Sequence, residues 1–158
     1  MKIIEQEEVR KLLQPKDCIQ LMAEALKGLE SGEYAQPARL ITVMPNTAKF
    51  GFMPAYVGDY FGAKVISAFA PNMGTKYPSH IGYVMLFESA HSTVAGMIEA
   101  GSITEIRTGA VSAAATDLLA RKDSHKLALI GAGAQARSHL AAIREIRDIT
   151  SVTVYDLF

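Results

Sequence analysis

One short segment constrains the fold of this chain of 158 residues more than any other: Gly131, Ala132, Gly133, Ala134, Gln135 and Ala136. It follows an apolar run at 126–130 and opens a stretch at 134–147 with helical periodicity. Gly131 permits a tight turn, Gly133 lets a ligand come close to the backbone, and Ala136 is small enough for close helix–strand packing. The pattern predicts the phosphate-binding turn of a strand–helix–strand unit, in which helix amides face the anion of a dinucleotide.

The residues after this segment support a dinucleotide and favour NAD over NADP. An apolar run at 151–155 predicts a second strand that ends at Asp156, about 20 residues beyond the third small residue of the turn. A carboxylate at this place accepts hydrogen bonds from the adenosine ribose and repels a 2′-phosphate. We expect the strand at 126–130 to be buried on both faces, as in parallel sheets. The alternative is a glycine-rich turn that binds no ligand.

The chain ends at Phe158, shortly after this second strand. A doubly wound sheet needs more than two strands, and one strand–helix–strand unit can neither cover both faces of a parallel sheet nor form the crevice in which a dinucleotide lies. We therefore expect this chain to be the amino-terminal part of a longer protein, or to need a partner that completes its sheet. A molecule that ended at Phe158 would be inactive and would bind NAD weakly or not at all.

Composition argues against nucleic acid, membrane and metal as partners. The 16 Lys and Arg residues balance 16 Asp and Glu residues, so no net charge attracts a polyanion. Cys18 is the only cysteine, which excludes an internal disulfide and a cysteine-built zinc site and fits a reducing cytoplasm. The amino terminus is charged too early for a signal peptide, and no apolar stretch is long enough to span a bilayer. We expect a cytoplasmic protein.

The rest of the chain predicts helices on either side of a sheet. A helix is expected at 7–13, and a longer one is capped by Asp17 and ended by Gly32. A third helix is expected at 104–120. Strands are expected at 39–44, 49–57, 61–69, 82–87 and 93–98, the last two forming a hairpin around 89–92. The fold class is therefore α/β: an α+β domain with an antiparallel sheet, followed by the first unit of an incomplete Rossmann-type parallel sheet.

Three cations stand at positions where a charge needs a partner. Arg39 and Lys64 each share a strand face with apolar residues, and a buried cation requires a carboxylate from the protein or from a ligand. Arg107 would lie in the first turn of the helix that a capping box of Ser102 and Glu105 begins. This is the positive end of the helix dipole, where an arginine is misplaced unless an anion is held there. The alternative is that Arg39 and Lys64 extend to solvent and Arg107 pairs with Glu105.

Several motifs resemble the ornithine cyclodeaminase and mu-crystallin family, over a region that runs from about Arg39 to the last residue. The resemblance is carried by Met53, Pro54, Ala55, Tyr56, Lys64, Pro78, Ser79, His80 and the segments 82–87, 103–108 and 131–136. It implies a substrate-binding and dimerisation domain at 1–112 and the start of an NAD-binding domain at 113–158. It also implies a homodimer whose substrate domains join their sheets, which fits strands that would otherwise expose edges.

The resemblance also assigns roles to single residues. The α-carboxylate of a small amino-acid substrate would be held by Arg39, Lys64 and Arg107. The contacts to NAD would come from Ser79, Arg107, Thr108, Gly131, Gly133, Ala134, Gln135 and Asp156. Lys64 is also the candidate catalytic residue, as a proton donor or acceptor, and otherwise acts as a charge clamp. His80 is either a proton relay or a structural residue.

The resemblance implies chemistry at the Cα of an amino acid, where family members pass a hydride to NAD and form an imine. In an ornithine cyclodeaminase, the expected activity, the side-chain amine then attacks the imine, ammonia leaves and the hydride returns. The alternatives are an amino-acid or imino-acid dehydrogenase, a ketimine reductase, or a mu-crystallin-type protein that binds cofactor and small molecule.

Two departures from the family pattern bear on this activity. Ser79 stands where cyclodeaminases usually have threonine, and Ser79 with His80 looks more like the mu-crystallin and ketimine reductase branch. The family's catalytic aspartate has no match, because Asp59, Asp117 and Asp123 fall outside its motif.

Overall fold

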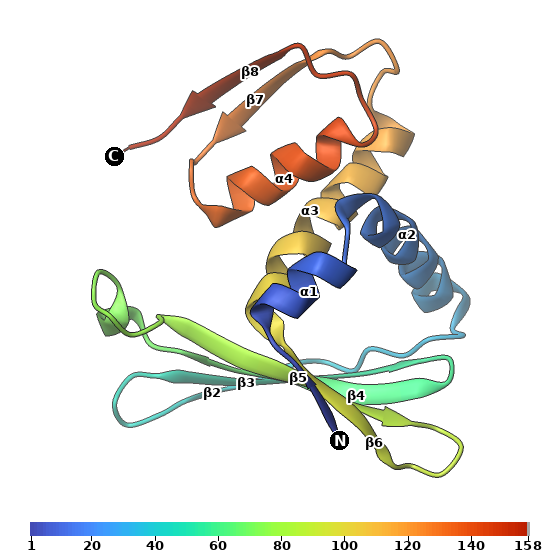
Figure 1. Cartoon of the computed structure of the whole chain (residues 1–158), viewed down its shortest axis with the longest axis vertical. Helices are drawn as coiled ribbons and strands as arrows, with labels where there is room; N and C mark the ends of the chain where they lie inside the picture. The colour runs from blue at the N-terminus through green and yellow to red at the C-terminus, as the bar shows by residue number, and fades with distance from the viewer. Residues whose placement is uncertain (158) are drawn as a thin grey trace. The chain divides into compact units, whose positions relative to one another are not determined.

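A six-stranded sheet carries the first part of the fold in the computed structural model, which describes residues 1–157 (Figure 1). The strands lie in the order β1-β6-β5-β4-β3-β2. Their bounds are β1 Lys2–Ile4, β2 Leu40–Val43, β3 Lys49–Val57, β4 Tyr60–Ala68, β5 His80–Glu88 and β6 Val94–Glu99. All neighbouring pairs are antiparallel except β1 and β6, so the mostly antiparallel sheet predicted from the sequence is confirmed.

The remaining elements are helices and a second, two-stranded sheet. The helices are α1 Gln6–Leu12, α2 Pro15–Ser31, a 3₁₀ turn at Ala70–Asn72, α3 Ala100–Leu119 and α4 Ala134–Arg144. The second sheet pairs β7, Lys126–Ile130, in parallel with β8, Ser151–Tyr155. The chain forms two compact units: the first comprises Met1–Arg10 and Lys27–Ser102, and the second Lys11–Leu26 and the chain from Ile103 onward. The proposed domain division at 112/113 falls inside α3 and stays a prediction.

Several strands were predicted accurately from the sequence. The predicted bounds of β3, β7 and β8 agree with the structure, and the hairpin between β5 and β6 is confirmed. The sequence did not predict β1, which pairs Lys2 with Gly96 in a parallel register. A strand of three residues shows too little alternation to stand out from a charged amino terminus.

Helix starts were predicted less well, and one of these errors concerns a candidate site residue. The Glu99 carboxylate accepts hydrogen bonds from the backbone N–H groups of Gly101, at 2.5 Å, and Ser102, at 2.8 Å, so it begins α3 at Ala100. The capping box at Ser102 is therefore wrong, and Arg107 lies in the second turn rather than the first. The dipole argument for an anion at Arg107 does not hold. Asp17 likewise lies in the first turn of α2, which begins at Pro15, while Gly32 ends that helix at φ +79° as predicted.

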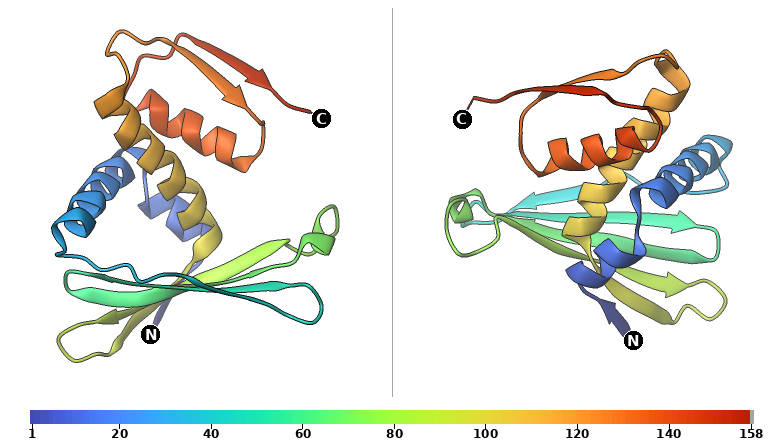
Figure 2. Two further views of the ribbon diagram at one scale, coloured as in Figure 1. Left: turned by 180° about the vertical axis from the view of Figure 1, so that it is seen from behind. Right: turned by 45° about the horizontal axis from the view of Figure 1, so that its top comes forward.

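The core of the second unit lies between α3, α4 and β7. Ala113, Ala142 and Ile143 are buried together, with Leu127 of β7 packed against them. Figure 2 shows α4 lying along one face of the pair β7 and β8. On its other face β7 is open, and Ile130 is 92% exposed. The prediction that β7 is buried on both faces is therefore wrong for the described residues, because one helix covers one face of a two-stranded sheet.

No helix in the described part of the chain combines the length and the apolar character that crossing a membrane requires.

Candidate functional site

The glycine-rich loop leads from the carboxyl end of β7 into α4. Gly131 has φ +99°, a backbone conformation that side chains rarely adopt, and its N–H donates to the Tyr155 carbonyl at 2.7 Å. Gly133 precedes the first residue of α4 with φ −72°, and no atom beyond its chain neighbours lies within 4 Å of the position that a Cβ would occupy there. Ala134 and Gln135 then form the first turn of the helix. The loop thus leaves open space in front of the amides of a helix start, which is the geometry that accepts a phosphate.

Asp156 follows β8 directly and lies against the same loop. Its carboxylate accepts a hydrogen bond from the backbone N–H of Ala132 at 2.5 Å. Because β7 and β8 are parallel neighbours, their carboxyl ends meet at one edge of the sheet. The structure therefore brings together five residues that the sequence singled out for a cofactor: Gly131, Gly133, Ala134, Gln135 and Asp156.

A hollow opens at the loop on the α4 side of the second unit. It is lined by Leu129, Ile130, Gly131, Gly133, Gln135, Ala136 and His139. Apart from backbone groups, its polar lining comes from Gln135 and His139. Sequence reasoning did not select His139, although its place four residues after Gln135 puts both on one helix face.

The second unit also contains Arg107 and Thr108, on the middle of α3. The Thr108 hydroxyl donates to the Thr104 carbonyl one turn earlier, at 2.6 Å. Arg107 is partly buried. Burial raises the pKa of the Cys18 thiol, and the positive charge of Arg107 opposes this rise. The next residue, Gly109, lies against the backbone of Ser138 in α4. The two candidate residues of α3 are thereby held close to the first turns of the helix that follows the glycine loop.

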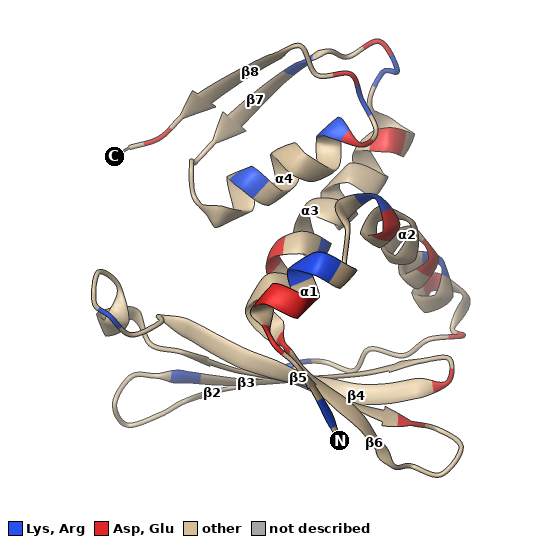
Figure 3. Ribbon diagram, in the orientation of Figure 1, with Lys and Arg blue, Asp and Glu red and all other residues tan. Residues whose placement is uncertain are grey.

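Lys64 lies at the centre of the sheet in the first unit. It pairs with Met53 on β3 and Val84 on β5, and paired residues point to the same face. Figure 3 shows how few charges the strands carry, and in β2 to β6 the other Lys, Arg, Asp and Glu residues stand at strand ends. A partly buried lysine in mid-strand is therefore a marked exception to the pattern of this sheet.

Arg39 stands immediately before β2 and is exposed. Since Leu40 pairs with Phe52, continuing the register by one residue sets Arg39 opposite Met53. Arg39 would then share a face with Lys64, about 10 Å away across two strand spacings. The expectation that apolar surroundings bury Arg39 is wrong for the described chain, because β2 is an edge strand with all its residues exposed.

Ser79 and His80 lie where the β4–β5 connection enters β5. The Ser79 hydroxyl and His80 Nδ1 are 3.2 Å apart, and the Ser79 carbonyl accepts from the Phe69 N–H at 2.8 Å. The Asn72 side-chain amide donates to the Pro78 carbonyl at 2.9 Å, which braces the loop. The first unit thus contains Arg39, Lys64 and Ser79, whereas the other candidates belong to the second unit. Among residues 1–157, no group of His, Cys, Asp and Glu side chains is arranged to hold a metal ion.

Comparison with protein families gives one match over the whole chain. The family model described as ornithine cyclodeaminase/mu-crystallin matches residues 1–158. The chain belongs to this family. The resemblance inferred from the sequence motifs is therefore confirmed.

Three similar proteins carry the names of reductases or dehydrogenases. Ketimine reductase mu-crystallin of Mus musculus is 35% identical over 127 residues, which cover 78% of this chain and 40% of that protein. The solved structure of Thermococcus litoralis Delta(1)-pyrroline-2-carboxylate reductase with NADH and L-proline is 33% identical, with a TM-score of 0.93, over 100% of this chain and 50% of that one. An archaeal alanine dehydrogenase dimer with bound NAD is 28% identical, with a TM-score of 0.93, over 98% and 48%. This family member spans about half the length of the curated relatives it matches.

Proposed function

We propose that this family member is part of an NAD-dependent enzyme that acts on the Cα of a small amino or imino acid. Its β7–α4–β8 unit would bind the adenosine half of NAD. The observation that carries the proposal is the hydrogen bond from Ala132 N–H to the Asp156 carboxylate. It fixes an acidic group beside a glycine-rich helix start, at the adjoining ends of two parallel strands. In a Rossmann-type unit this carboxylate accepts hydrogen bonds from the ribose hydroxyls, and the helix amides face the pyrophosphate.

For the substrate, we propose that Arg39, Lys64 and Arg107 bind the α-carboxylate. The β2–β3 register, continued by one residue beyond Leu40, would set Arg39 on the sheet face of Lys64, which supports two of these contacts. An arginine can hold a carboxylate by two parallel hydrogen bonds, which fixes its orientation as well as its place. Lys64 is the candidate to give or take a proton, because an ammonium in mid-sheet is a compact donor whose proton can leave. Ser79 and Thr108 are proposed to complete the contacts to NAD.

When bound, NAD accepts a hydride from the substrate Cα or NADH returns one to it. The residues of this chain would orient the carboxylate so that the Cα lies in one place, and such positioning supplies much of the rate in bimolecular reactions. The relatives named above support a reductase or dehydrogenase that interconverts amino and imino acids. Cyclodeamination, the first expectation from the sequence motifs, uses the same carboxylate and cofactor contacts and stays open to test.

An activity assay separates these reactions. If the protein is a reductase, the absorbance of NADH should fall when Delta(1)-pyrroline-2-carboxylate is added. If it is a dehydrogenase, NADH absorbance should rise when NAD and L-alanine are supplied. L-Ornithine should release ammonia without net change in NADH in a cyclodeaminase. Both the chain alone and a fusion to the second half of the Archaeoglobus fulgidus alanine dehydrogenase should be assayed, because the relatives are about twice as long. Failure of the fusion with every substrate would overturn the proposed enzyme.

A titration of the ¹⁵N-labelled chain with NAD tests the cofactor site without turnover. The amide signals of Gly131, Ala132, Gly133 and Gln135 should shift, and NADP should shift them less. Substituting Asp156→Ser should weaken NAD binding and reduce the preference over NADP, because the carboxylate both bonds the ribose and repels a 2′-phosphate. Equal shifts with NAD and NADP in the unmodified chain would contradict the role given to Asp156.

We also propose a homodimer that forms through one face of the six-stranded sheet. Large apolar side chains more than a third exposed share this face, called here the aromatic face: Leu40, Phe50, Phe52, Tyr56 and Ile81. Apolar side chains that gather on one exposed face are typical of a surface that binds another protein. The archaeal alanine dehydrogenase is a dimer, which supports a second copy as the partner.

A further inference from the structure

The sheet face that carries Lys64, called here the lysine face, is ordered in rows that run across the strands. Residues paired between neighbouring strands point to the same face, and so do residues two apart along one strand. Lys64 belongs to a row with its partners Met53 on β3 and Val84 on β5. The rows on either side of it consist of Ile41, Gly51, Ile66 and Gly82, and of Ala55, Gly62, Leu86 and Gly96. Lys64 is therefore flanked on this face by rows of aliphatic residues and glycines.

Two isoleucines cover the glycines of the first of these rows. A Cβ added at Gly51 would lie 2.8 Å from Cγ1 of Ile66 and 2.9 Å from Cδ1 of Ile41. A Cβ added at Gly82 would lie 2.7 Å from Cγ2 of Ile66. The glycines thus make room for the isoleucine side chains, which meet over Gly51. They form an aliphatic surface one row, about 7 Å, away from Lys64.

Acidic side chains on the lysine face are far from Lys64. In the described strands β2 to β6, Glu88 at the end of β5 is the one Asp or Glu residue on this face. It lies four residues beyond Val84, about 13 Å along the strand. Its carboxylate accepts hydrogen bonds from the backbone N–H groups of His91 and Thr93, both at 3.0 Å. Glu88 is thus bound by its own hairpin and too far away to pair with an ammonium group held beside Lys64.

These rows bear on the side chain of the substrate. If Arg39 and Lys64 bind the α-carboxylate, a side chain that lies against the sheet is placed over one of the rows beside Lys64. An apolar side chain gains free energy there by leaving water. A second ammonium group would lose its hydration without meeting a carboxylate of the sheet, and Arg39 and Lys64 would repel it.

We propose that the site selects amino or imino acids with an apolar side chain over diamino acids, and that Ile66 is a specificity-determining residue. This inference rests on the proposed binding of the α-carboxylate by Arg39 and Lys64. It names the substrate class of that site and favours a dehydrogenase or reductase over a cyclodeaminase, which acts on diamino acids.

Amino acids of equal length that differ in one terminal group test this selection. L-Norleucine has a methyl group where L-ornithine has its side-chain ammonium, and L-norvaline is related to L-2,4-diaminobutyrate in the same way. Dissociation constants are measured by calorimetry on the fusion to the second half of the Archaeoglobus fulgidus alanine dehydrogenase. NADH is bound throughout, and because it accepts no hydride the amino acids do not react. We expect the apolar member of each pair to bind about tenfold more tightly or better.

A second fusion shows which half of the protein determines the selection. It carries the second half of a lysine cyclodeaminase, whose solved structure is 28% identical to this chain with a TM-score of 0.81, over 98% of this chain and 48% of that one. The preference for the apolar ligands should remain, because it is proposed to come from the sheet. Equal binding, tighter binding of the diamino acids, or a preference that changes with the second half would overturn the inference. If neither fusion bound any of the four ligands, the proposed carboxylate site would be refuted, and the inference with it.

Substituting Ile66→Asp tests the role of this residue. The new carboxylate should give the ammonium of L-ornithine a partner and bring its dissociation constant to within about threefold of that of L-norleucine. Ile66→Asn is the matched control, because it has the same shape without the charge and should keep more of the original ratio. Thermal unfolding shows whether both variants fold. If the two folded variants changed the ratio equally, Ile66 would not determine specificity. If either variant fails to fold, the ratio in the two unmodified fusions decides.

Discussion

Gly109 of α3 lies so close to Ser138 of α4 that a side chain there would meet the backbone: an added Cβ would be 2.5 Å from the Ser138 carbonyl oxygen and 2.8 Å from its carbon. Two helices cross at such short distance only when one of them lacks a Cβ at the contact. The crossing links Thr108, the residue before Gly109, to the helix that starts at the glycine-rich loop. The relative placement of the candidate residues within the second unit therefore depends on one glycine.

Substituting Gly109→Ala should destabilise the chain. In an open helix the change would stabilise by about 1 kcal/mol, because alanine has the higher helix propensity. At this crossing we expect a loss of about 1 to 3 kcal/mol instead, since the helices must move apart. Urea unfolding gives the sign directly. A stabilised Gly109→Ala variant would show that the crossing can open freely.

Asp117 near the end of α3 should make the stability of the second unit depend on pH. Arg147, 8% exposed, donates to its carboxylate, and Lys122 does so at 2.9 Å. Lys122 first and Arg147 second hold the pKa of Asp117 below its usual range. A lowered folded-state pKa contributes stability above the unfolded value, about 4, and this is lost as the pH falls through the lowered pKa.

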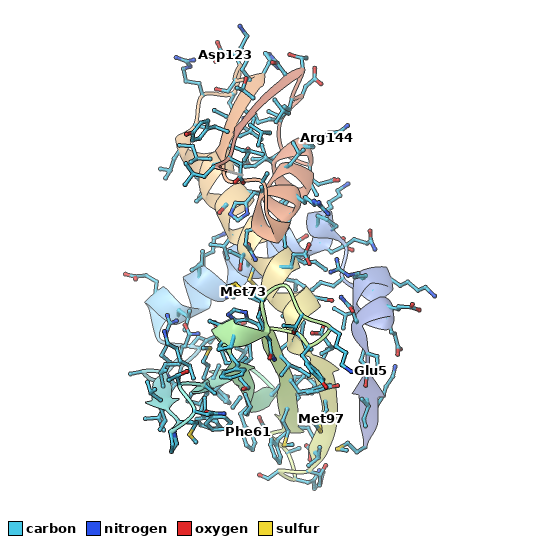
Figure 4. The ribbon with its side chains drawn as sticks, turned by 90° about the vertical axis from the view of Figure 1, so that its left-hand side faces the viewer. Glu5, Phe61, Met73, Met97, Asp123 and Arg144 are labelled. Carbon is cyan, nitrogen blue, oxygen red and sulfur yellow. The ribbon has the colours of Figure 1, made fainter. Side chains whose placement is uncertain are left out.

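Urea midpoints of the unmodified chain and Asp117→Asn should therefore differ most near neutral pH and converge below about pH 4. Asp123→Asn is the matched control: Asp123 is exposed in the turn before β7, where Figure 4 labels it. If the urea midpoints of the unmodified chain and Asp117→Asn differed by the same amount at every pH, the lowered pKa assigned to Asp117 would be wrong.

Sequence patterns predicted the strands of this fold because each pattern is local. Alternation over nine residues in β3 defines its two faces, and a five-residue apolar run before Gly131 defines β7. The spacing from the glycine-rich loop to Asp156 is also local to one strand–helix–strand unit, and the structure places these residues side by side.

Contacts that depend on tertiary structure were not predictable in this way. The cap of α3 comes from Glu99 at the end of a strand, a residue type that cap preferences rank below Ser, Thr, Asp and Asn. The role of Gly109 depends on where α4 crosses α3, which no pattern within either helix reveals. The exposure of Arg39 follows from the place of β2 at the sheet edge, and strand order is a property of the whole sheet.

A charge on the aromatic face should separate the proposed dimer. Phe52, 41% exposed, lies on this face, which also includes the stacked pair Phe61 and Phe87 with ring centroids 5.3 Å apart. Figure 4 labels Phe61 on the sheet. Phe52→Asp should shift the mass measured by sedimentation from dimer to monomer, because burying an unpaired carboxylate in an apolar interface is costly. Val57→Asp is the control on the opposite face of the same strand, 44% exposed. An unmodified chain that is monomeric at all concentrations would refute the dimer.

Gly131 and Gly133 should respond differently to the same substitution, which separates folding from ligand binding. Both have open space where a Cβ would lie, but only Gly131 has a positive φ, +99°. Gly131→Ala should therefore cost about 1 to 2 kcal/mol of folding free energy through backbone strain. Gly133→Ala should leave the urea midpoint almost unchanged, since its φ of −72° suits alanine, yet should weaken NAD binding, because the methyl group occupies the space into which a pyrophosphate fits. Equal NAD affinity of Gly133→Ala and the unmodified chain would mean that the phosphates lie elsewhere.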